Sequence, residues 1–353
     1  MDKYYLAAVY TLTSSGGKIL TELLPKFQTA KAIWQAFDDD LLEAYPKNQR
    51  IIRNFLAKRK AKPNYPEELY TDCYQKGVKI ATKFEAEIFP SLLPAAEPDI
   101  YILFYKGELR AKDKRIAVVG SRNITAYGEI VATNIGRDLA RDGITVVSGG
   151  AYGVDCYSHR GALEYGRTEL VLGCGIDLYY PSAHRKLIDQ VAEVGAVVSE
   201  YPPGVRATNY TFPARNRIIS GMSLGTVVVE AARKSGSLIT AKYAKKQGRD
   251  LFAVPGDIFS EMSVGTNNLI REGAKLITAG TDIVAALDNE LGPMPSLFDD
   301  AASGGGTANP VTPTALTSEL TRQGEELGEE LPRPVRRPRH EVKPAKRARH
   351  WVR

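Results

Sequence analysis

Cysteine is scarce in this sequence, and long apolar runs are missing. The 353 residues include three cysteines, Cys73, Cys156 and Cys174, which form no close pair. This spacing predicts neither a disulfide framework nor a Cys-x-x-Cys metal site, and free thiols suit a reducing compartment. No stretch approaches the roughly 18 uninterrupted apolar residues of a membrane span. No basic segment precedes the first apolar residues, so we also expect no signal peptide. The sequence therefore predicts a cytoplasmic protein with no membrane segment and no metal site.

Positive charge is also scarce outside the C-terminal end. The formal net charge of the whole chain is +6, but residues 333–353 alone carry +8 and residues 1–332 carry −2. A surface that binds a polyanion within residues 1–332 must therefore come from local patterning of cations, because bulk charge does not supply it.

Three regions differ in their patterning. Residues 1–108 are mostly helical in pattern, with one short strand expected at Ile100–Phe104, and we interpret them as a small helical N-terminal domain with a linker. Residues 109–292 alternate short apolar strands with helical segments, which is typical of a doubly wound, mostly parallel α/β sheet of Rossmann-like type. The expected strands are Ile116–Val119, Ile144–Val147, Leu170–Leu172, Ala196–Val198, Thr226–Val229 and Leu251–Val254.

Residues 293–353 have the composition of a disordered tail. Glycine, proline and a run of glutamates come first, and the basic residues follow, so this stretch cannot bury a core. One transient helix is expected at Leu316–Leu327. The basic end either contacts phosphates without sequence preference or is simply a charged, disordered end.

The loop after the first expected strand of the α/β domain is suited to an anion. In Gly120-Ser121-Arg122-Asn123, glycine allows a tight turn, the hydroxyl of Ser121 and free backbone N–H groups can donate hydrogen bonds, and Arg122 adds a cation. The alternative is a strand-to-helix turn in which the serine only caps the helix.

The loop after the second strand is rich in glycine. Ser148-Gly149-Gly150 and Gly153 allow a phosphate to approach the backbone at a helix N-terminus. Tight packing of the helix on the sheet would explain the same glycines. Asp155 and His159 lie four residues apart, and we interpret them as a helix cap and a hydrogen-bonded structural histidine rather than as an acid–base or metal pair.

The segment from Phe212 to Gly221 combines an aromatic ring with cations. Phe212, Arg215, Asn216 and Arg217 are the residue types that bind single-stranded nucleic acid, because a ring stacks on a base while guanidinium groups pair with phosphates. Arg215 and Arg217 diverge by about 200° on a helix, so we expect one of them to face the ligand and the other to form an ion pair.

A fourth loop, around Ser235-Gly236-Ser237, precedes a helix that contains Lys242. Its hydroxyl and N–H groups can donate to an anion at the helix N-terminus. The lysines of that helix, taken alone, are equally consistent with a solvated face.

Together these motifs resemble the DprA/Smf family, the DNA-processing proteins of natural transformation. No single motif is specific, but the ordered set is, and the resemblance covers roughly residues 60–290. The matching segments are Gly120-Ser121-Arg122, Ser148-Gly149-Gly150-Ala151-x-Gly153-Val154-Asp155, Phe212-Pro213-x-Arg215-Asn216-Arg217-Ile218-Ile219-Ser220-Gly221, Gly236-Ser237-Leu238-Ile239-Thr240-Ala241, Val254-Pro255-Gly256 and Gly265-Thr266-Asn267-x-Leu269-Ile270-x-x-Gly273-Ala274.

The resemblance implies a DNA-binding protein that protects single-stranded DNA and loads the RecA recombinase onto it, as a homodimer and without catalytic residues or cofactors. It places the DNA-binding residues in a basic pocket: Ser121, Arg122, Ser148, Gly149, Gly150, Gly153, Phe212, Arg215, Asn216, Arg217, Ser235, Gly236, Ser237 and Lys242. It also implies a sterile-alpha-motif-like fold for the N-terminal domain. Two features depart from the family pattern. Many members have a helix-hairpin-helix-like glycine turn near the N-terminus, where this chain has Ser14–Lys18. Many members also end in a winged-helix domain, for which the tail of this chain is too polar.

An enzyme remains the alternative. Related Rossmann-like phosphoribohydrolases bind nucleoside monophosphates with a PGGxGTxxE loop, to which the segments Ser148–Ala151 and Gly225-Thr226 correspond only in part. Glu230, at the end of a strand, is the candidate acid. Release of adenine from AMP would distinguish this hypothesis from DNA binding.

Overall fold

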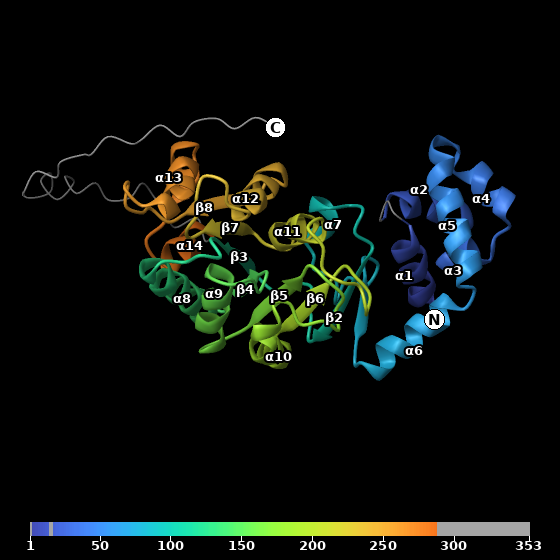
Figure 1. The fold of residues 1–353 in the computed structure, drawn as a ribbon, viewed down its shortest axis with the longest axis horizontal. Coiled ribbons are helices and arrows are strands. Elements are labelled where there is room, and N and C mark those ends of the chain that lie inside the picture. The colour runs from blue at the N-terminus through green and yellow to red at the C-terminus, as the bar shows by residue number, and fades with distance from the viewer. Residues whose placement is uncertain (1, 14–16, 288–353) are drawn as a thin grey trace, which may run out of the picture. The chain divides into compact units, whose positions relative to one another are not determined.

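The computed structural model describes residues 2–13 and 17–287. The predicted tail and its expected helix lie outside these residues. The helices are α1 (Asp2–Leu12), α2 (Lys18–Phe27), α3 (Ala30–Gln35), α4 (Asp38–Ala44), α5 (Gln49–Ala61), α6 (Tyr65–Gln75), α7 (Leu93–Ala96), α8 (Ala126–Arg141), α9 (Val154–Leu163), α10 (Arg185–Val194), α11 (Thr211–Gly221), α12 (Ser237–Lys246), α13 (Val264–Arg271) and α14 (Gly280–Leu287) (Figure 1).

Among the described residues, nine strands form a single sheet. They are β1 (Lys79–Thr82), β2 (Ile102–Gly107), β3 (Arg115–Val119), β4 (Thr145–Ser148), β5 (Thr168–Leu172), β6 (Ala196–Ser199), β7 (Gly225–Val228), β8 (Asp250–Ala253) and β9 (Lys275–Leu276). Their order across the sheet is β1-β2-β6-β5-β4-β3-β7-β8-β9. The strands from β3 to β9 pair in parallel, whereas β1 pairs antiparallel with β2 and β2 antiparallel with β6. The predicted doubly wound, mostly parallel α/β fold is confirmed.

The sheet extends toward the N-terminus beyond the predicted boundary at residues 108–109. Strand β2 pairs with β6 through Phe104 and Ser199, among others, and β1 continues the sheet on the far side of β2. Residues 79–107 therefore complete the edge of the α/β sheet, and the described residues form one compact unit with it. The helical pattern predicted for the N-terminal region holds for residues 2–75.

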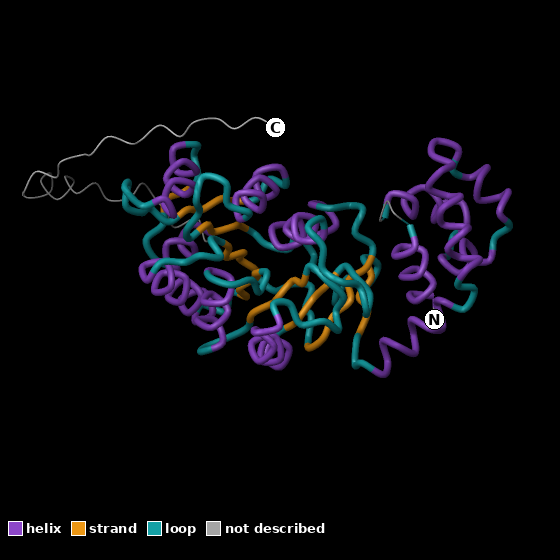
Figure 2. Tube along the Cα trace, viewed as in Figure 1, coloured by secondary structure: helices purple, strands orange, loops and turns teal. Residues whose placement is uncertain are grey.

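Helices cover both faces of the sheet because its central strands are apolar on both sides. All five residues of β3 and of β5 are buried, which is the pattern of a parallel strand inside a layered fold. Helices α8, α9 and α10 lie on one face, and α11 and α12 lie on the other (Figure 2). The N-terminal helices share a continuous core with the sheet, in which Tyr10 and Ile102 are both buried.

The order of the strands determines where a ligand can bind. The chain runs outward from β3 through β4 and β5 to β6, and then returns to place β7 on the other side of β3. At such a switch point the loops that leave two adjacent strands diverge, and a crevice opens at their carboxyl ends. Within the described residues, no helix combines the length and apolar character needed to cross a membrane.

Candidate nucleic-acid interface

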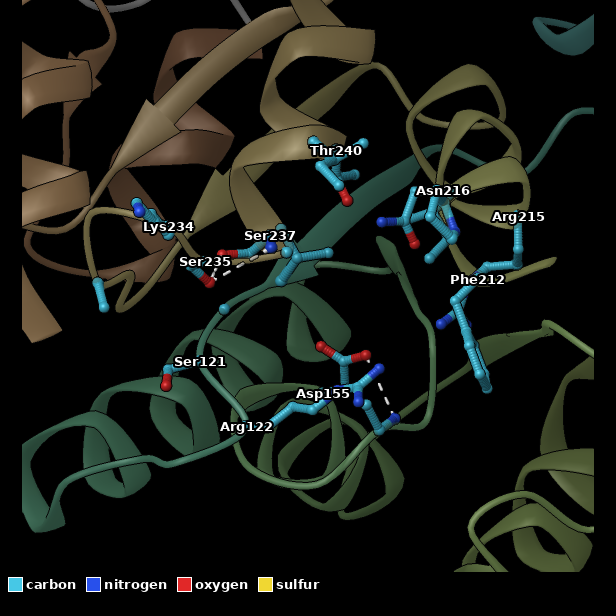
Figure 3. Close-up of a pocket in the computed structure, with 18 of the residues that line it drawn as sticks. Ser121, Arg122, Asp155, Phe212, Arg215, Asn216, Lys234, Ser235, Ser237 and Thr240 are labelled. Carbon is cyan, nitrogen blue, oxygen red and sulfur yellow. Dashed lines mark hydrogen bonds between the residues drawn. The ribbon is translucent and has the colours of Figure 1, made fainter. Parts of the chain in front are cut away.

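A cavity of about 690 Å³ lies at this switch point. Its walls come from the loops after β3, β4, β5, β6 and β7 and from helices α11 and α12 (Figure 3). The lining residues that carry a polar or aromatic side chain are Ser121, Arg122, Asn123, Asp155, Tyr180, Asn209, Phe212, Arg215, Asn216, Lys234, Ser235, Ser237 and Thr240.

Eight of the predicted DNA-binding residues line this cavity, and six do not. The eight are Ser121, Arg122, Phe212, Arg215, Asn216, Ser235, Gly236 and Ser237. The other six do not line it: Ser148, Gly149, Gly150, Gly153, Arg217 and Lys242. Of these, Gly149 lines a smaller adjoining space and Lys242 lines a separate cavity.

In the loop after β3, the side chain of Arg122 is available to a ligand, whereas the hydroxyl of Ser121 forms hydrogen bonds within the loop. The hydroxyl of Ser121 donates a hydrogen bond to the Asn123 carbonyl at 2.9 Å and accepts one from the Asn123 N–H. Arg122 is exposed, and its guanidinium carbon lies 5.6 Å from the centroid of the Phe212 ring. Arg122 is therefore the cation of this loop that a phosphate can reach.

Backbone N–H groups of the glycine-rich loop after β4 already bind a carboxylate of this chain. The carboxylate of Asp155 accepts hydrogen bonds from the backbone N–H groups of Gly149 and Ala151, at 3.2 and 3.3 Å. The hydroxyl of Ser148 is buried and donates to the Val118 carbonyl. Two of the backbone donors that the sequence offered to a phosphate are thus occupied by Asp155, and the Ser148 hydroxyl is occupied by a carbonyl group of the sheet.

Asp155 and His159 are both buried, but Asp155 does not cap α9 as expected, because its carboxylate bonds to N–H groups of the preceding loop. Burial raises the pKa of the Asp155 carboxyl group, although Arg215 and the N–H groups that it accepts from oppose this shift. His159 contacts the Thr168 hydroxyl through Nδ1 at 2.6 Å, and burial lowers the pKa of its imidazole to about 3. The Thr168 hydroxyl donates to the Val146 carbonyl, so Nδ1 of His159 carries the proton in this contact. This supports the interpretation of His159 as a structural histidine.

Helix α11 supplies one wall of the cavity. Arg215 is 95% buried, and its guanidinium donates to the carbonyl oxygens of Gly149 and Val171. Its Nε has no hydrogen-bond partner among the described residues. Burial lowers the pKa of this guanidinium, and the nearby carboxylate of Asp155 opposes the shift. Arg215 thus places a fixed, largely desolvated positive charge in the cavity wall.

Arg217, two residues further on, points into a different environment. It donates two hydrogen bonds to the carboxylate of Glu200, at 2.6 and 2.7 Å, and one to Glu97 at 3.3 Å. The buried hydroxyl of Tyr10 in α1 donates to the same Glu200 carboxylate. Its charge is therefore neutralised by two glutamates, as one arginine of the pair was expected to be, and its contact with DNA stays a prediction.

The loop before α12 forms the opposite wall. The hydroxyl groups of Ser235 and Ser237 lie 2.8 Å apart, and Lys234 beside them is exposed, with no ion pair among the described residues. Lys242 lines a separate cavity of about 490 Å³ between α12 and α13, together with Lys245 and Arg249. Lys242 therefore does not line the cavity that Phe212 lines, and its contact with DNA stays a prediction.

Sequence reasoning missed several residues that line the cavity, Tyr180 and Asn209 above all. Both lie on long loops, after β5 and after β6, that carry no recognisable motif. Their positions at the carboxyl ends of strands are the one signal that pointed to them.

Glu230, the candidate acid of the enzyme alternative, is engaged in the fold. Only 3% of it is exposed, and its carboxylate accepts hydrogen bonds from the Thr125 N–H at 3.0 Å and from the Thr125 hydroxyl at 2.5 Å. Thr125 in turn caps α8, since its hydroxyl accepts from the Gly128 N–H. Glu230 therefore orients the start of this helix. Within the described residues, no cluster of three or more histidine, cysteine, aspartate or glutamate side chains is arranged to hold a metal ion.

The chemistry of the cavity favours an anionic, aromatic ligand. Its charged lining residues are three cations, Arg122, Arg215 and Lys234, and one buried carboxylate, Asp155. Two aromatic rings, Tyr180 and Phe212, lie beside the arginines. Cations that contact phosphates and rings that stack on bases are together the elements of a site for single-stranded nucleic acid.

Comparison with known families agrees with this chemistry. Residues 80–288 match the model of the family described as DNA recombination-mediator protein A. The chain is 36% identical over 263 residues to DNA processing protein DprA of Bacillus subtilis, covering 72% of this chain and 88% of that protein. It is 34% identical to Protein Smf of Synechocystis, covering 81% of this chain and 73% of that protein. Against the putative DprA of Mycobacterium tuberculosis the identity is 46%, but the match spans 43% of that protein's length.

Two solved structures share the fold. DNA processing protein A from Streptococcus pneumoniae superposes with a TM-score of 0.70 at 31% identity, covering 81% of this chain and 98% of that chain. DNA processing protein A from Helicobacter pylori, whose structure concerns its mode of binding single-stranded DNA, gives a TM-score of 0.54 at 29% identity, covering 61% of this chain and 98% of that one.

Proposed function

Because this chain belongs to the DNA recombination-mediator protein A family, also called DprA/Smf, we propose that it binds single-stranded DNA in the cavity at the switch point of its sheet. Phosphates of the strand contact Arg122 and Lys234, and the buried charge of Arg215 adds to the attraction from the wall. Bases meet the aromatic side of the cavity. These contacts do not read base edges, so binding is largely independent of DNA sequence.

One observation carries this proposal: exposed Arg122 lies against an aromatic ring inside the cavity and is not neutralised by a carboxylate of the described residues. Arg217 on helix α11 gives the contrast: its guanidinium is paired with the carboxylates of Glu97 and Glu200. A cation left without a counter-charge beside an aromatic ring is suited to a phosphate whose base stacks nearby.

The wider role follows from the family and is likewise proposed. We infer that the protein protects incoming or processed single strands, loads the RecA recombinase onto them during transformation or recombination, and acts as a homodimer. RecA filament formation on strands coated with a single-strand-binding protein, with and without this protein, tests the loading step. Light scattering coupled to size-exclusion chromatography tests the dimer.

Fluorescence anisotropy of labelled oligo-dT, titrated across salt concentrations with the full chain, tests the binding itself. About five engaged phosphates give a log–log slope near −3.5. Incubation with AMP is the companion measurement, because release of adenine would support the enzyme alternative. Absence of oligo-dT binding at low salt would contradict the proposed function.

A further inference from the structure

Tyr180 presents an aromatic surface inside the cavity that no sequence motif pointed to. The side chain is 44% exposed, and its ring centroid lies 5.0 Å from that of Phe212, with the two rings inclined by 41°. It lines the main cavity together with Arg122 and Arg215. An exposed ring beside two guanidinium groups is the local arrangement that single-stranded nucleic acid requires.

Phe212 is less available to a ligand than its neighbour. A Cβ atom added to Gly173 would lie 2.8 Å from Cδ1 of Phe212, so the backbone of the loop after β5 is packed against this ring. The guanidinium of Arg122 and the ring of Tyr180 contact Phe212 as well, and the side chain is only partly exposed. A base that enters the cavity therefore meets Tyr180 with fewer contacts to displace.

A second, smaller space lies among Tyr152, Tyr180 and Phe212. Its volume is about 60 Å³, far less than the 690 Å³ of the main cavity. Tyr152 is 50% exposed and is held edge-on by His184, at a centroid distance of 4.8 Å. His184 is itself fixed by a 2.9 Å contact between its Nδ1 and the Gly150 carbonyl.

We propose that Tyr180 is the ring on which a base of the bound strand stacks, and that Tyr152 continues the same aromatic surface for a neighbouring base. This inference rests on the proposed function and specifies its ligand as the nucleobases of single-stranded DNA. Phe212 then acts as the support that holds Tyr180 in place, while Arg122 contacts the adjacent phosphate.

The test separates bases from phosphates by comparing two labelled strands of equal length, oligo-dT and a strand made entirely of abasic sites. The full chain is compared with Tyr180→Leu, which removes the ring, and with Tyr180→Phe, which removes only the hydroxyl. Tyr165→Leu is the matched control. Tyr165 is also exposed, at 54%, and also has a guanidinium over its ring, that of Arg141 at 4.2 Å, but it does not line either cavity.

Stacking predicts that Tyr180→Leu weakens binding of oligo-dT about tenfold and changes binding of the abasic strand by less than about twofold. Tyr180→Phe and Tyr165→Leu stay close to the unmodified chain on both strands. The inference is overturned if Tyr180→Leu weakens both strands equally, or if Tyr180→Phe loses as much as Tyr180→Leu, because the role would then be a hydroxyl–phosphate contact. If the unmodified chain does not bind oligo-dT, the proposed function fails first and this inference fails with it.

Discussion

The guanidinium of Arg217 donates two hydrogen bonds to the carboxylate of Glu200, at 2.6 and 2.7 Å. Glu200 follows β6 directly, and Arg217 lies on the helix that also carries Arg215. The pair is mostly buried, with 19% of the Arg217 side chain and 8% of the Glu200 side chain exposed. Two arginines separated by one residue therefore have different roles. Arg215 lines the cavity, and Arg217 connects α11 to the end of β6 through Glu200.

Replacing Arg217 with glutamine is expected to lower the free energy of unfolding by about 3 kcal/mol or more, because two mostly buried carboxylates lose their partner. The salt dependence of DNA binding should stay the same, since Arg217 neutralises glutamates rather than phosphates. Urea denaturation and a salt titration of the variant measure the two effects. Arg185→Gln is the control: its exposed ion pair with Asp189 predicts a loss of at most about 1 kcal/mol. A shallower salt slope for Arg217→Gln would contradict this assignment.

Arg122→Gln should have the opposite profile. Its side chain is exposed and has no ion pair among the described residues, so its removal should leave the free energy of unfolding nearly unchanged. If Arg122 contacts one phosphate, the log–log salt slope becomes less negative by about 0.7, and affinity falls at low salt. Anisotropy titrations at several salt concentrations measure this slope. An unchanged slope with unchanged affinity would remove Arg122 from the interface.

Gly153→Ala is expected to disturb the cavity wall. Gly153 has a φ of 75°, and a Cβ atom there would lie 2.2 Å from the Ser121 carbonyl oxygen, in the loop that carries Arg122. Both the strain and the clash predict a loss of roughly 3 kcal/mol or more in stability, with weaker DNA binding. Thermal unfolding and anisotropy together check it.

Gly204 provides the matched control for this substitution. Its φ is 83°, but no atom lies within 4 Å of the position that a Cβ would take. Gly204→Ala should therefore cost only the backbone strain, about 1–2 kcal/mol. Equal losses for the two variants would show that the contact with the loop after β3 is unimportant.

His159 predicts a specific dependence of stability on pH. Its folded pKa of about 3 lies below the value of about 6.5 expected for an unfolded chain. The contribution of neutral His159 to the free energy of unfolding is therefore complete above pH ~6.5. It is lost progressively as the pH falls toward 3, because the unfolded chain takes up a proton that the folded protein does not.

The variant His159→Met, which cannot take up this proton, isolates the effect. Between pH 7.5 and pH 5 the unmodified chain should lose about 2 kcal/mol more stability than the variant. Urea unfolding at the two pH values gives this difference. Identical pH profiles for the two proteins would mean that His159 is protonated in the folded state.

The strands of the α/β region were predictable because each is a short apolar run between helical segments. Leu251–Val254 was expected and Asp250–Ala253 is found, a shift of one residue. Strand β9 could not be predicted, since its two residues, Lys275 and Leu276, are both exposed and carry no burial pattern. The sequence also gives little indication of strand β1, whose four residues follow a helix and a glycine turn.

The candidate site was predictable in its loops but not in its internal pairing. Residue types and spacing pointed to Arg122, Phe212 and Arg215, which do line one cavity. They could not show that Asp155 occupies the N–H groups of the glycine loop, because a loop that binds its own carboxylate has the same composition as one that binds a phosphate. Nor could they show that Tyr10 reaches Glu200, which lies 190 residues away in the chain.

In the proposed complex, single-stranded DNA lies in the cavity between α11 and the loops after β3 and β7. Photocrosslinking of the full chain to an oligonucleotide that contains 5-iodouracil, followed by mass spectrometry of the linked peptides, tests it most directly. Binding in the cavity predicts crosslinks to the peptides that contain Tyr180 and Phe212, and their loss when unlabelled oligo-dT competes. Crosslinks confined to peptides outside the cavity, such as those of residues 333–353, would contradict it.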